Sequence, residues 1–253
     1  MRKDKGEEDM KKRVLTALLA ATLLTITGCS SMPGMGNTAP ASGNENAGAE
    51  KTDDKVYELK IHTSQTEQAL ITRNYQKLAD AVNEKSDGRL KLQVFPAGQL
   101  GADEDVIEQA IQGVNVAVNT DAARLGQYVK DFSIFMMAYF VDDYDEGYAV
   151  TQTETFKNWE KELEEKHGIK ILSFTFYDGP RHFMTNKAVN TPEDLKGMRI
   201  RTIGQEVCTE SLAAMGATPI SMSWGEVYNG IQSKALEGCE AQNTSTFPSK
   251  IYE

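Results

Sequence analysis

Two arginines, Arg199 and Arg201, lie two positions apart in a segment that alternates charged and apolar residues. In a β-strand, positions i and i+2 point to the same face, so both guanidinium groups should lie opposite Met198 and Ile200. A guanidinium offers a planar fork of donors that fits both oxygens of a carboxylate, and it stays charged when desolvated. The alternation alone does not choose between the two arginines. Arg201 is nearer the carboxyl end of the strand, where open α/β sheets bind ligands, so we predict a carboxylate site there, with a surface arginine as the alternative.

The histidines argue against catalysis and against a metal site. His62, His167 and His182 are the only three, and no pair has the spacing of metal ligands or of a catalytic triad. The Gly-x-Ser-x-Gly motif and the phosphate-binding loop are absent from the sequence. His182 could face a ligand, but a lone histidine is more often structural. The sequence therefore predicts a binding protein rather than an enzyme, with no cofactor.

The composition is that of a soluble globular protein with an acidic surface. The chain has 253 residues, of which 40% are hydrophobic and 25% charged, and its formal net charge is −10. Such a surface repels phosphate backbones, which excludes nucleic acid as a partner. Cys208 and Cys239 fit no zinc or redox spacing, so we expect two small buried residues rather than a disulfide.

The N-terminal residues have the pattern of an export signal. A basic stretch, Met10–Arg13, precedes an apolar run, Val14–Ile26. This run is too short to span a bilayer, which needs about 20 residues. Small residues followed by Cys29 resemble a bacterial lipobox, whose cysteine becomes the lipidated first residue of the mature protein. An ordinary signal peptide with an incidental cysteine is the alternative.

These patterns define the expected boundaries. We predict a signal peptide over residues 1–28, with Met10 as an alternative start because signal peptides rarely begin with charged residues. Residues 29–55 carry the lipidated Cys29 and a disordered tether, since they are rich in Gly, Ala, Asn, Ser and Pro and lack any apolar period. The protein should therefore be extracytoplasmic and anchored to the cell membrane by lipid.

The remaining sequence alternates strand and helix patterns, which indicates sheets with helices on their faces. The first strands and helices are predicted at Tyr57–Thr63, Ala69–Lys85, Arg89–Phe95, Asp103–Gln112 and Val114–Asn119. Next come an apolar run expected in the core, one or two helices and a strand, at Phe132–Val141, Asp145–Lys166 and Ile169–Phe176. The final strands are predicted at Arg181–Thr185, Met198–Thr202, Thr218–Met222 and Leu236–Ala241. Helices should begin after Thr191, at Glu206 and at Ser223, which has Glu226 at capping-box spacing.

Several of these segments together resemble a known family. They are Phe95–Gly101, Asn190–Arg201, Met215–Pro219, Trp224–Tyr228, Leu236–Gly238 and Lys250–Glu253. Their order and spacing resemble the solute-binding proteins of TRAP (tripartite ATP-independent periplasmic) transporters, from about Tyr57 to the last residue. The resemblance implies a two-domain, periplasmic-binding-protein-like α/β fold with a ligand cleft, divided into residues 56–177 and 178–253. It also implies that the second domain is incomplete at Glu253, with apolar surface exposed, because a long helix follows this position in the family.

The resemblance also implies which residues bind the ligand. Arg201 would clamp the carboxylate, and Arg181 would be a second ligand-facing arginine, with an ion pair near the domain junction as its alternative. Five further candidates match family positions: Asp121, Arg124, Trp224, Ser64 and Asp103. A mutual salt bridge or a helix cap is the alternative for Asp121 and Arg124, and core packing is the alternative for Trp224.

The implied function is capture of a small carboxylate, an organic or sugar acid, and its delivery to TRAP membrane subunits by a monomeric binding protein. One alternative is a ligand sensor for a membrane receptor or sensor kinase, and another is an amide or neutral sugar ligand, which would leave Arg201 underused. Two residues depart from the family pattern. Ala241 replaces an asparagine that several acid-binding members have, with Gln242 or Asn243 as substitutes, and Ala138 replaces a proline. These changes leave the identity of the acid open.

Overall fold

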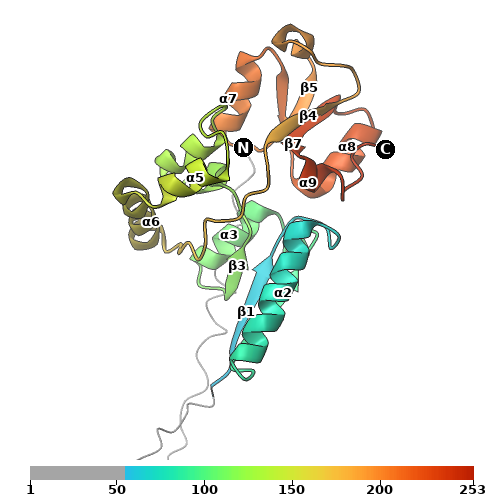
Figure 1. The fold of residues 1–253 in the computed structure, drawn as a ribbon. Helices are drawn as coiled ribbons and strands as arrows, with labels where there is room; N and C mark the ends of the chain where they lie inside the picture. The colour runs from blue at the N-terminus through green and yellow to red at the C-terminus, as the bar shows by residue number, and fades with distance from the viewer. Residues whose placement is uncertain (1–54) are drawn as a thin grey trace, which may run out of the picture. The chain divides into compact units, whose positions relative to one another are not determined.

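The computed structural model describes residues 55–253 (Figure 1). The predictions on the signal peptide, on Cys29 and on the tether up to Asp54 lie outside the described residues. Over residues 55–253, no helix combines the length and the apolar character needed to cross a membrane.

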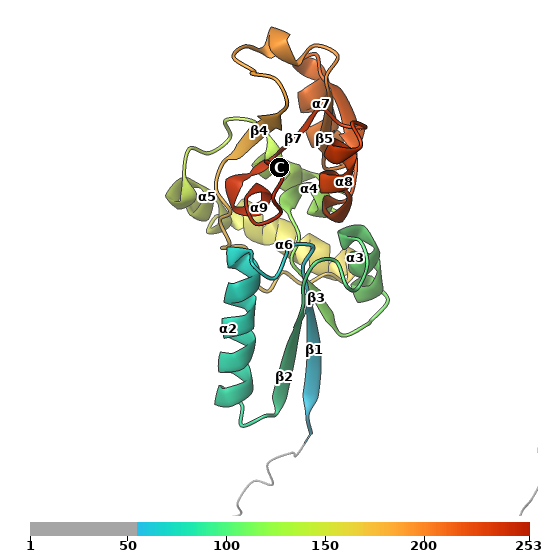
Figure 2. The same cartoon turned by 90° about the vertical axis from the view of Figure 1, so that its right-hand side faces the viewer.

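The first sheet is parallel and contains three strands in the order β2-β1-β3. Its elements are β1 (Tyr57–His62), α2 (Leu70–Lys85), β2 (Leu90–Phe95), α3 (Asp103–Ile111) and β3 (Val116–Val118). Figure 2 shows the three strands side by side, with α2 along β2. His62 pairs with Phe95 on one side and with Val118 on the other. The carboxyl ends of all three strands therefore meet at His62, at the edge where parallel sheets usually bind ligands.

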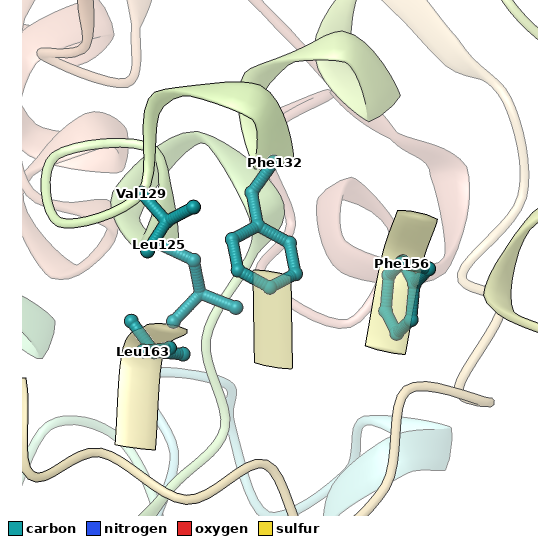
Figure 3. Packing of buried hydrophobic residues seen from close by; sticks show 5 residues of the cluster. All are labelled: Leu125, Val129, Phe132, Phe156 and Leu163. Atoms are coloured by element: carbon teal, nitrogen blue, oxygen red, sulfur yellow. The ribbon is translucent and has the colours of Figure 1, made fainter. Parts of the chain in front are cut away.

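A helical segment follows, with an aromatic core. It contains α4 (Ala122–Leu125), the 3₁₀ helix η1 (Lys130–Met136), α5 (Tyr144–Thr151) and α6 (Glu154–His167). Figure 3 shows five buried side chains of this core: Leu125, Val129, Phe132, Phe156 and Leu163. The Phe132 ring lies 5.6 Å from Phe156 and 5.8 Å from Trp159, both edge to face, which is the arrangement that aromatic quadrupoles favour.

The prediction that all of Phe132–Val141 is core is wrong for its second half. Phe132 is fully buried, but Met137 is 56% exposed and Tyr139 is 98% exposed. The helix η1 ends at Met136, and Tyr139 then adopts a left-handed backbone conformation with φ of 61°. The change of backbone direction turns the later side chains away from the core, which a count of apolar residues does not detect.

The predicted strand at Ile169–Phe176 is also wrong. In the described chain, residues 170–177 form no backbone hydrogen bond with any strand. Ile169, Ile171 and Phe174 nevertheless pack on the aromatic core, whereas Leu172 is 71% exposed. The apolar pattern identified which side chains are buried, but a strand also needs a neighbouring strand, and none lies beside this segment in the described chain.

The second sheet is mixed and has the order β4-β7-β5-β6. Its strands are β4 (Arg181–Thr185), β5 (Arg199–Thr202), β6 (Thr218–Ser221) and β7 (Gly238–Gln242), and only β4 runs antiparallel, to β7. The helices that accompany this sheet are η2 (Pro192–Leu195), α7 (Glu206–Ala214), η3 (Trp224–Glu226), α8 (Val227–Gln232) and α9 (Asn243–Thr246). Two apolar clusters hold these layers, one around Ile200 and Leu212 and one around Val227 and Cys239.

Capping residues and proline in the sequence predicted where most of these helices begin. Pro192 begins η2, and the Thr191 backbone N–H donates to Asp194 Oδ2 at 2.9 Å. The predicted capping box at Ser223 is only partly right, because Ser223 Oγ donates to the Glu226 carboxylate itself at 2.7 Å and caps no backbone N–H. The helix accordingly begins with the 3₁₀ turn η3.

Candidate ligand-binding site

Arg201 lies in the middle of the second sheet and is only 3% exposed. Its Nε donates to the Met222 carbonyl at 2.9 Å. Among the described residues, neither Nη atom donates a hydrogen bond and no carboxylate lies within ion-pair distance. Burial lowers the pKa of Arg201 to about 10, and the guanidinium therefore stays protonated at neutral pH. The charge of Glu240 raises this pKa but lies beyond ion-pair distance, so the Nη donors remain able to bind both oxygens of a carboxylate.

Arg199 differs sharply from Arg201, although both lie on β5. Its side chain is 47% exposed, and its Nε lies 3.5 Å from Glu237 Oε2. One Nη atom also donates to the Lys234 carbonyl at 3.1 Å. Arg199 is therefore a surface arginine that already contacts a carboxylate and a carbonyl, which makes it a matched control for Arg201.

Trp224 positions the Arg201 guanidinium. The guanidinium carbon lies 5.3 Å from the centre of the Trp224 ring, a cation–π distance. The indole N–H donates to Ser249 Oγ at 3.2 Å, and the ring also packs on the cluster around Val227. Trp224 thus combines core packing with a direct contact to the candidate anion site.

Arg181 is paired within the protein. Its Nε and one Nη donate to the two carboxylate oxygens of Glu240, and the second Nη donates to Gln242 Oε1 at 3.2 Å. Burial lowers the pKa of Arg181, but the hydrogen bond and charge of Glu240 outweigh it, and the net direction is upward. The ion pair that the sequence left as an alternative therefore describes the contacts of Arg181 in this structure.

Arg124 lies at the carboxyl edge of the first sheet and is surrounded by carboxylates. It contacts Asp121 at hydrogen-bond distance, Glu104 at 2.7 Å and Asp103 at 3.4 Å. Asp121 is also the N-cap of α4, since it accepts the Arg124 backbone N–H at 3.0 Å. Burial lowers the pKa of Arg124, but the charges of the three carboxylates outweigh burial, and the net direction is upward. Both the salt bridge and the cap expected as alternatives are present.

Asp103 links this cluster to β1. Ser64 Oγ donates to Asp103 Oδ2 at 3.2 Å, and His62 Nε2 lies 3.0 Å from Asp103 Oδ1. The aspartate thus stands between the serine and the histidine, whereas a nucleophilic triad needs the histidine to contact the serine. The arrangement is a cluster of mutually bonded polar side chains rather than an activated nucleophile. Among residues 55–253, no group of three or more His, Cys, Asp or Glu could hold a metal ion.

The two groups of charges lie within electrostatic reach of each other. After the larger effects of burial and of Glu240, Asp121 contributes by raising the pKa of Arg181, and Arg124 contributes by lowering the pKa of Arg201. A small apolar cluster of Ala123, Ile203 and Cys208 joins α4 to α7. The predicted candidates thus fall into two groups. One surrounds Arg201 and includes Trp224 and the Arg181–Glu240 pair. The other, which we call the Arg124 wall, consists of Arg124, Asp121, Glu104, Asp103 and Ser64.

Three residues in or beside these groups were not predicted: His62, Glu104 and Glu240. Each acts through a partner distant in sequence, such as the 59-residue separation between Arg181 and Glu240. The adjacency of Glu104 to Asp103 was the only local signal. Two surface hollows of about 560 and 340 Å³ are lined by His182–Val189 and by residues of α2 and α9, and neither is lined by Arg201.

Cys208 and Cys239 are buried free thiols, which confirms the prediction of two small buried residues. Burial raises the pKa of each thiol to about 11, and Glu240 adds to the shift. In the unfolded chain a thiol has a pKa of about 8.5, so it loses its proton at a lower pH than in the folded protein. The free energy of unfolding therefore falls as the pH rises. We expect a loss of about 2 kcal/mol per cysteine between pH 8 and pH 10, measured by urea unfolding.

The control for this prediction is the double variant Cys208→Ala/Cys239→Ala. Its unfolding free energy should change much less between pH 8 and pH 10 than that of the parent protein. Equal pH slopes for the two proteins would show that the thiols do not couple ionisation to unfolding.

The chain is similar to known bacterial proteins. Residues 61–253 match the model of the bacterial extracellular solute-binding proteins, family 7. The chain is 28% identical over 176 residues to the sialic acid-binding periplasmic protein SiaP of Vibrio cholerae, covering 70% of this chain and 54% of SiaP. It is 28% identical over 178 residues to the C4-dicarboxylate-binding periplasmic protein DctP of the same species, covering 70% of this chain and 52% of that protein. The chain spans about half the length of these curated relatives.

A solved structure agrees with the sequence matches. The TRAP periplasmic solute-binding protein of Actinobacillus succinogenes with bound L-galactonate superposes with a TM-score of 0.75 at 29% identity, covering 78% of this chain and 65% of that one. The family match extends over most of the sequence. The chain therefore belongs to the bacterial extracellular solute-binding proteins of family 7, the solute-binding family of TRAP transporters, and has their two-domain α/β fold.

Proposed function

We propose that this protein captures a small carboxylate at Arg201 and delivers it to the membrane subunits of a TRAP transporter. The observation that carries the proposal is the state of Arg201, a 3% exposed guanidinium with no carboxylate partner among the described residues. Desolvation of an arginine is unfavourable, and an anionic ligand that occupies the free Nη donors offsets it. The names of relatives that bind sialic acid, C4-dicarboxylates and L-galactonate support a carboxylate as that anion.

Several finer features are part of the same proposal. Arg201 is the clamp, Trp224 holds it in place, and the Arg124 wall, with Asp121, Asp103 and Ser64, contacts the rest of the ligand. Arg181 acts through its pairing with Glu240 and lies close enough to influence Arg201 electrostatically. The match between residues 56–177 and 178–253 and the two domains of the family is likewise proposed.

The proposed setting of the protein is extracytoplasmic. Export followed by lipidation of Cys29 would leave the folded part on a tether at the membrane, within reach of the transporter subunits. The apolar run Val14–Ile26, followed by small residues and Cys29, supports this anchor. Its direct check is the mass of the mature N-terminus isolated from membranes, which should be that of a lipid-modified cysteine rather than of free Cys29.

The test of binding is a thermal-shift screen of organic and sugar acids, each paired with its neutral amide. A ligand at 100 times its Kd stabilises a protein by about 2.7 kcal/mol, so binders should raise the Tm clearly. We expect acids to raise the Tm and their amides to leave it unchanged. Equal shifts from acids and amides, or no shift from any acid, would contradict the carboxylate site. Prolonged incubation followed by NMR should recover every bound acid unchanged, because the protein binds rather than transforms its ligand.

A further inference from the structure

The charges around Arg201 are unevenly distributed, and this distribution limits the ligand. Three guanidinium groups belong to the site, those of Arg201, Arg181 and Arg124. They face four carboxylates, those of Asp103, Glu104, Asp121 and Glu240. These three arginines and four carboxylates together carry one net negative charge before any ligand binds.

Within residues 55–253, one of the three cations has no carboxylate partner and can bind a ligand. Arg124 is shared among three carboxylates, and Arg181 is held by both oxygens of Glu240. Among the described residues, Arg201 alone of the three lacks a carboxylate partner. A ligand with two carboxylates would therefore bind one of them at Arg201, and the other would have to displace an internal carboxylate.

The wall around Arg124 presents acceptors rather than donors. Asp121 and Glu104 are 26% and 43% exposed, so their oxygens remain accessible while they hold Arg124. An ionised carboxylate only accepts hydrogen bonds. The wall therefore suits hydroxyl or ammonium groups and repels a second carboxylate, which is itself only an acceptor and carries the same charge.

We propose that the site selects monocarboxylates whose far end carries hydrogen-bond donors, either hydroxyl or ammonium groups, and that it rejects dicarboxylates. This inference rests on the proposed function, because it takes Arg201 as the anchor of one carboxylate. It narrows that function by assigning the rejection of the second carboxylate to Asp121, Glu104 and the occupied arginines.

The experiment compares acids that differ only at their far end. Gluconate and glucarate share one carbon skeleton, with a hydroxymethyl group or a second carboxylate at the end. The shorter set of 4-hydroxybutyrate, 4-aminobutyrate and succinate makes the same comparison with a hydroxyl, an ammonium and a carboxylate. Isothermal titration calorimetry at pH 7.5 should give a Kd at least about tenfold lower for a donor-bearing acid than for its dicarboxylate, a difference of about 1.4 kcal/mol.

A variant tests the wall itself. Asp121→Asn removes one negative charge and supplies an amide donor, while asparagine still caps a helix well. It should reduce the ratio of the two Kd values several-fold. The matched control is Asp80→Asn, which changes an exposed aspartate on α2 and should leave the ratio unchanged.

The outcomes distinguish a failure of this inference from a failure of the proposed function. Tighter binding of gluconate or of a four-carbon donor acid, with a smaller ratio in Asp121→Asn, supports the inference, and the hydroxyl and ammonium arms identify the donor. Dicarboxylates that bind as well as or better than the donor acids would overturn it and leave a carboxylate-binding protein. A ratio that Asp121→Asn does not change would overturn the assignment to this wall. Failure of all these acids to bind would overturn the proposed function as well.

Discussion

The variant Arg201→Ala is expected to bind its carboxylate ligand about 30-fold or more weakly than the parent protein. Loss of one charge-assisted, desolvated contact costs about 2–5 kcal/mol, and 1.4 kcal/mol corresponds to a factor of ten in affinity. Arg201 should lie at the upper part of this range because it is buried and, within the described chain, has no other anionic partner. Calorimetry with the tightest acid from the screen measures the effect.

Two further variants make this result specific. Arg199→Ala changes the same residue type on the same strand, but its guanidinium is 47% exposed and already paired with Glu237, so affinity should not change. Arg201→Lys keeps the charge and loses the planar fork, and it should recover only part of the affinity. Unchanged affinity in Arg201→Ala would refute the clamp, and equal losses in both alanine variants would point to a general effect of charge.

The largest expected effect on stability comes from Glu240→Ala. This residue holds Arg181 through both carboxylate oxygens and accepts a hydrogen bond from Thr202 Oγ1. Its removal leaves Arg181, which is 24% exposed, without a counter-charge and close enough to Arg201 to lower the pKa of that group. Removing one partner of a buried ion pair costs about 3–5 kcal/mol, and because this pair is only partly buried the loss should lie near the lower end of that range. Urea unfolding at pH 7.5 should show a loss of this size.

Glu237, the residue just before β7, provides the control. Glu237 pairs with the exposed Arg199, and exposed ion pairs are worth about 0–1 kcal/mol. Glu237→Ala should therefore destabilise the protein much less than Glu240→Ala. Equal losses in the two variants would mean that the Arg181–Glu240 pair contributes no more than a surface ion pair.

The sequence predicted the elements whose local signals and long-range partners agree. The strand at Tyr57 and the helix at Asp103 begin as expected, because alternation, acidic first-turn residues and turns all favour the same structure. The strand at Ile169 was wrong because pairing depends on a neighbour that no local pattern reveals. The Phe132–Val141 run was wrong in its second half because the backbone turns at Tyr139.

The site shows the same division between local and tertiary information. Strand alternation and strand direction are local properties: alternation sets both arginines on one face, and strand direction favours Arg201 over Arg199 from a few neighbouring positions alone. The pairing of Arg181 depends on the antiparallel register of β4 and β7, which sets Arg181 opposite Gln242 and within reach of Glu240. Glu240 and His62 could not be found from sequence patterns, since their partners come from other strands and helices.

The unpaired stretch at residues 170–177 has a consequence for the handling of this protein. A segment whose backbone donors and acceptors have no strand partner among residues 55–253, with Leu172 and Tyr177 more than half exposed, is a template for intermolecular β-pairing. At neutral pH the net charge of −10 keeps the molecules apart. Near the sequence pI of about 5.0 that repulsion vanishes, so colloidal self-association should set in on mild acidification, well before the fold itself is lost.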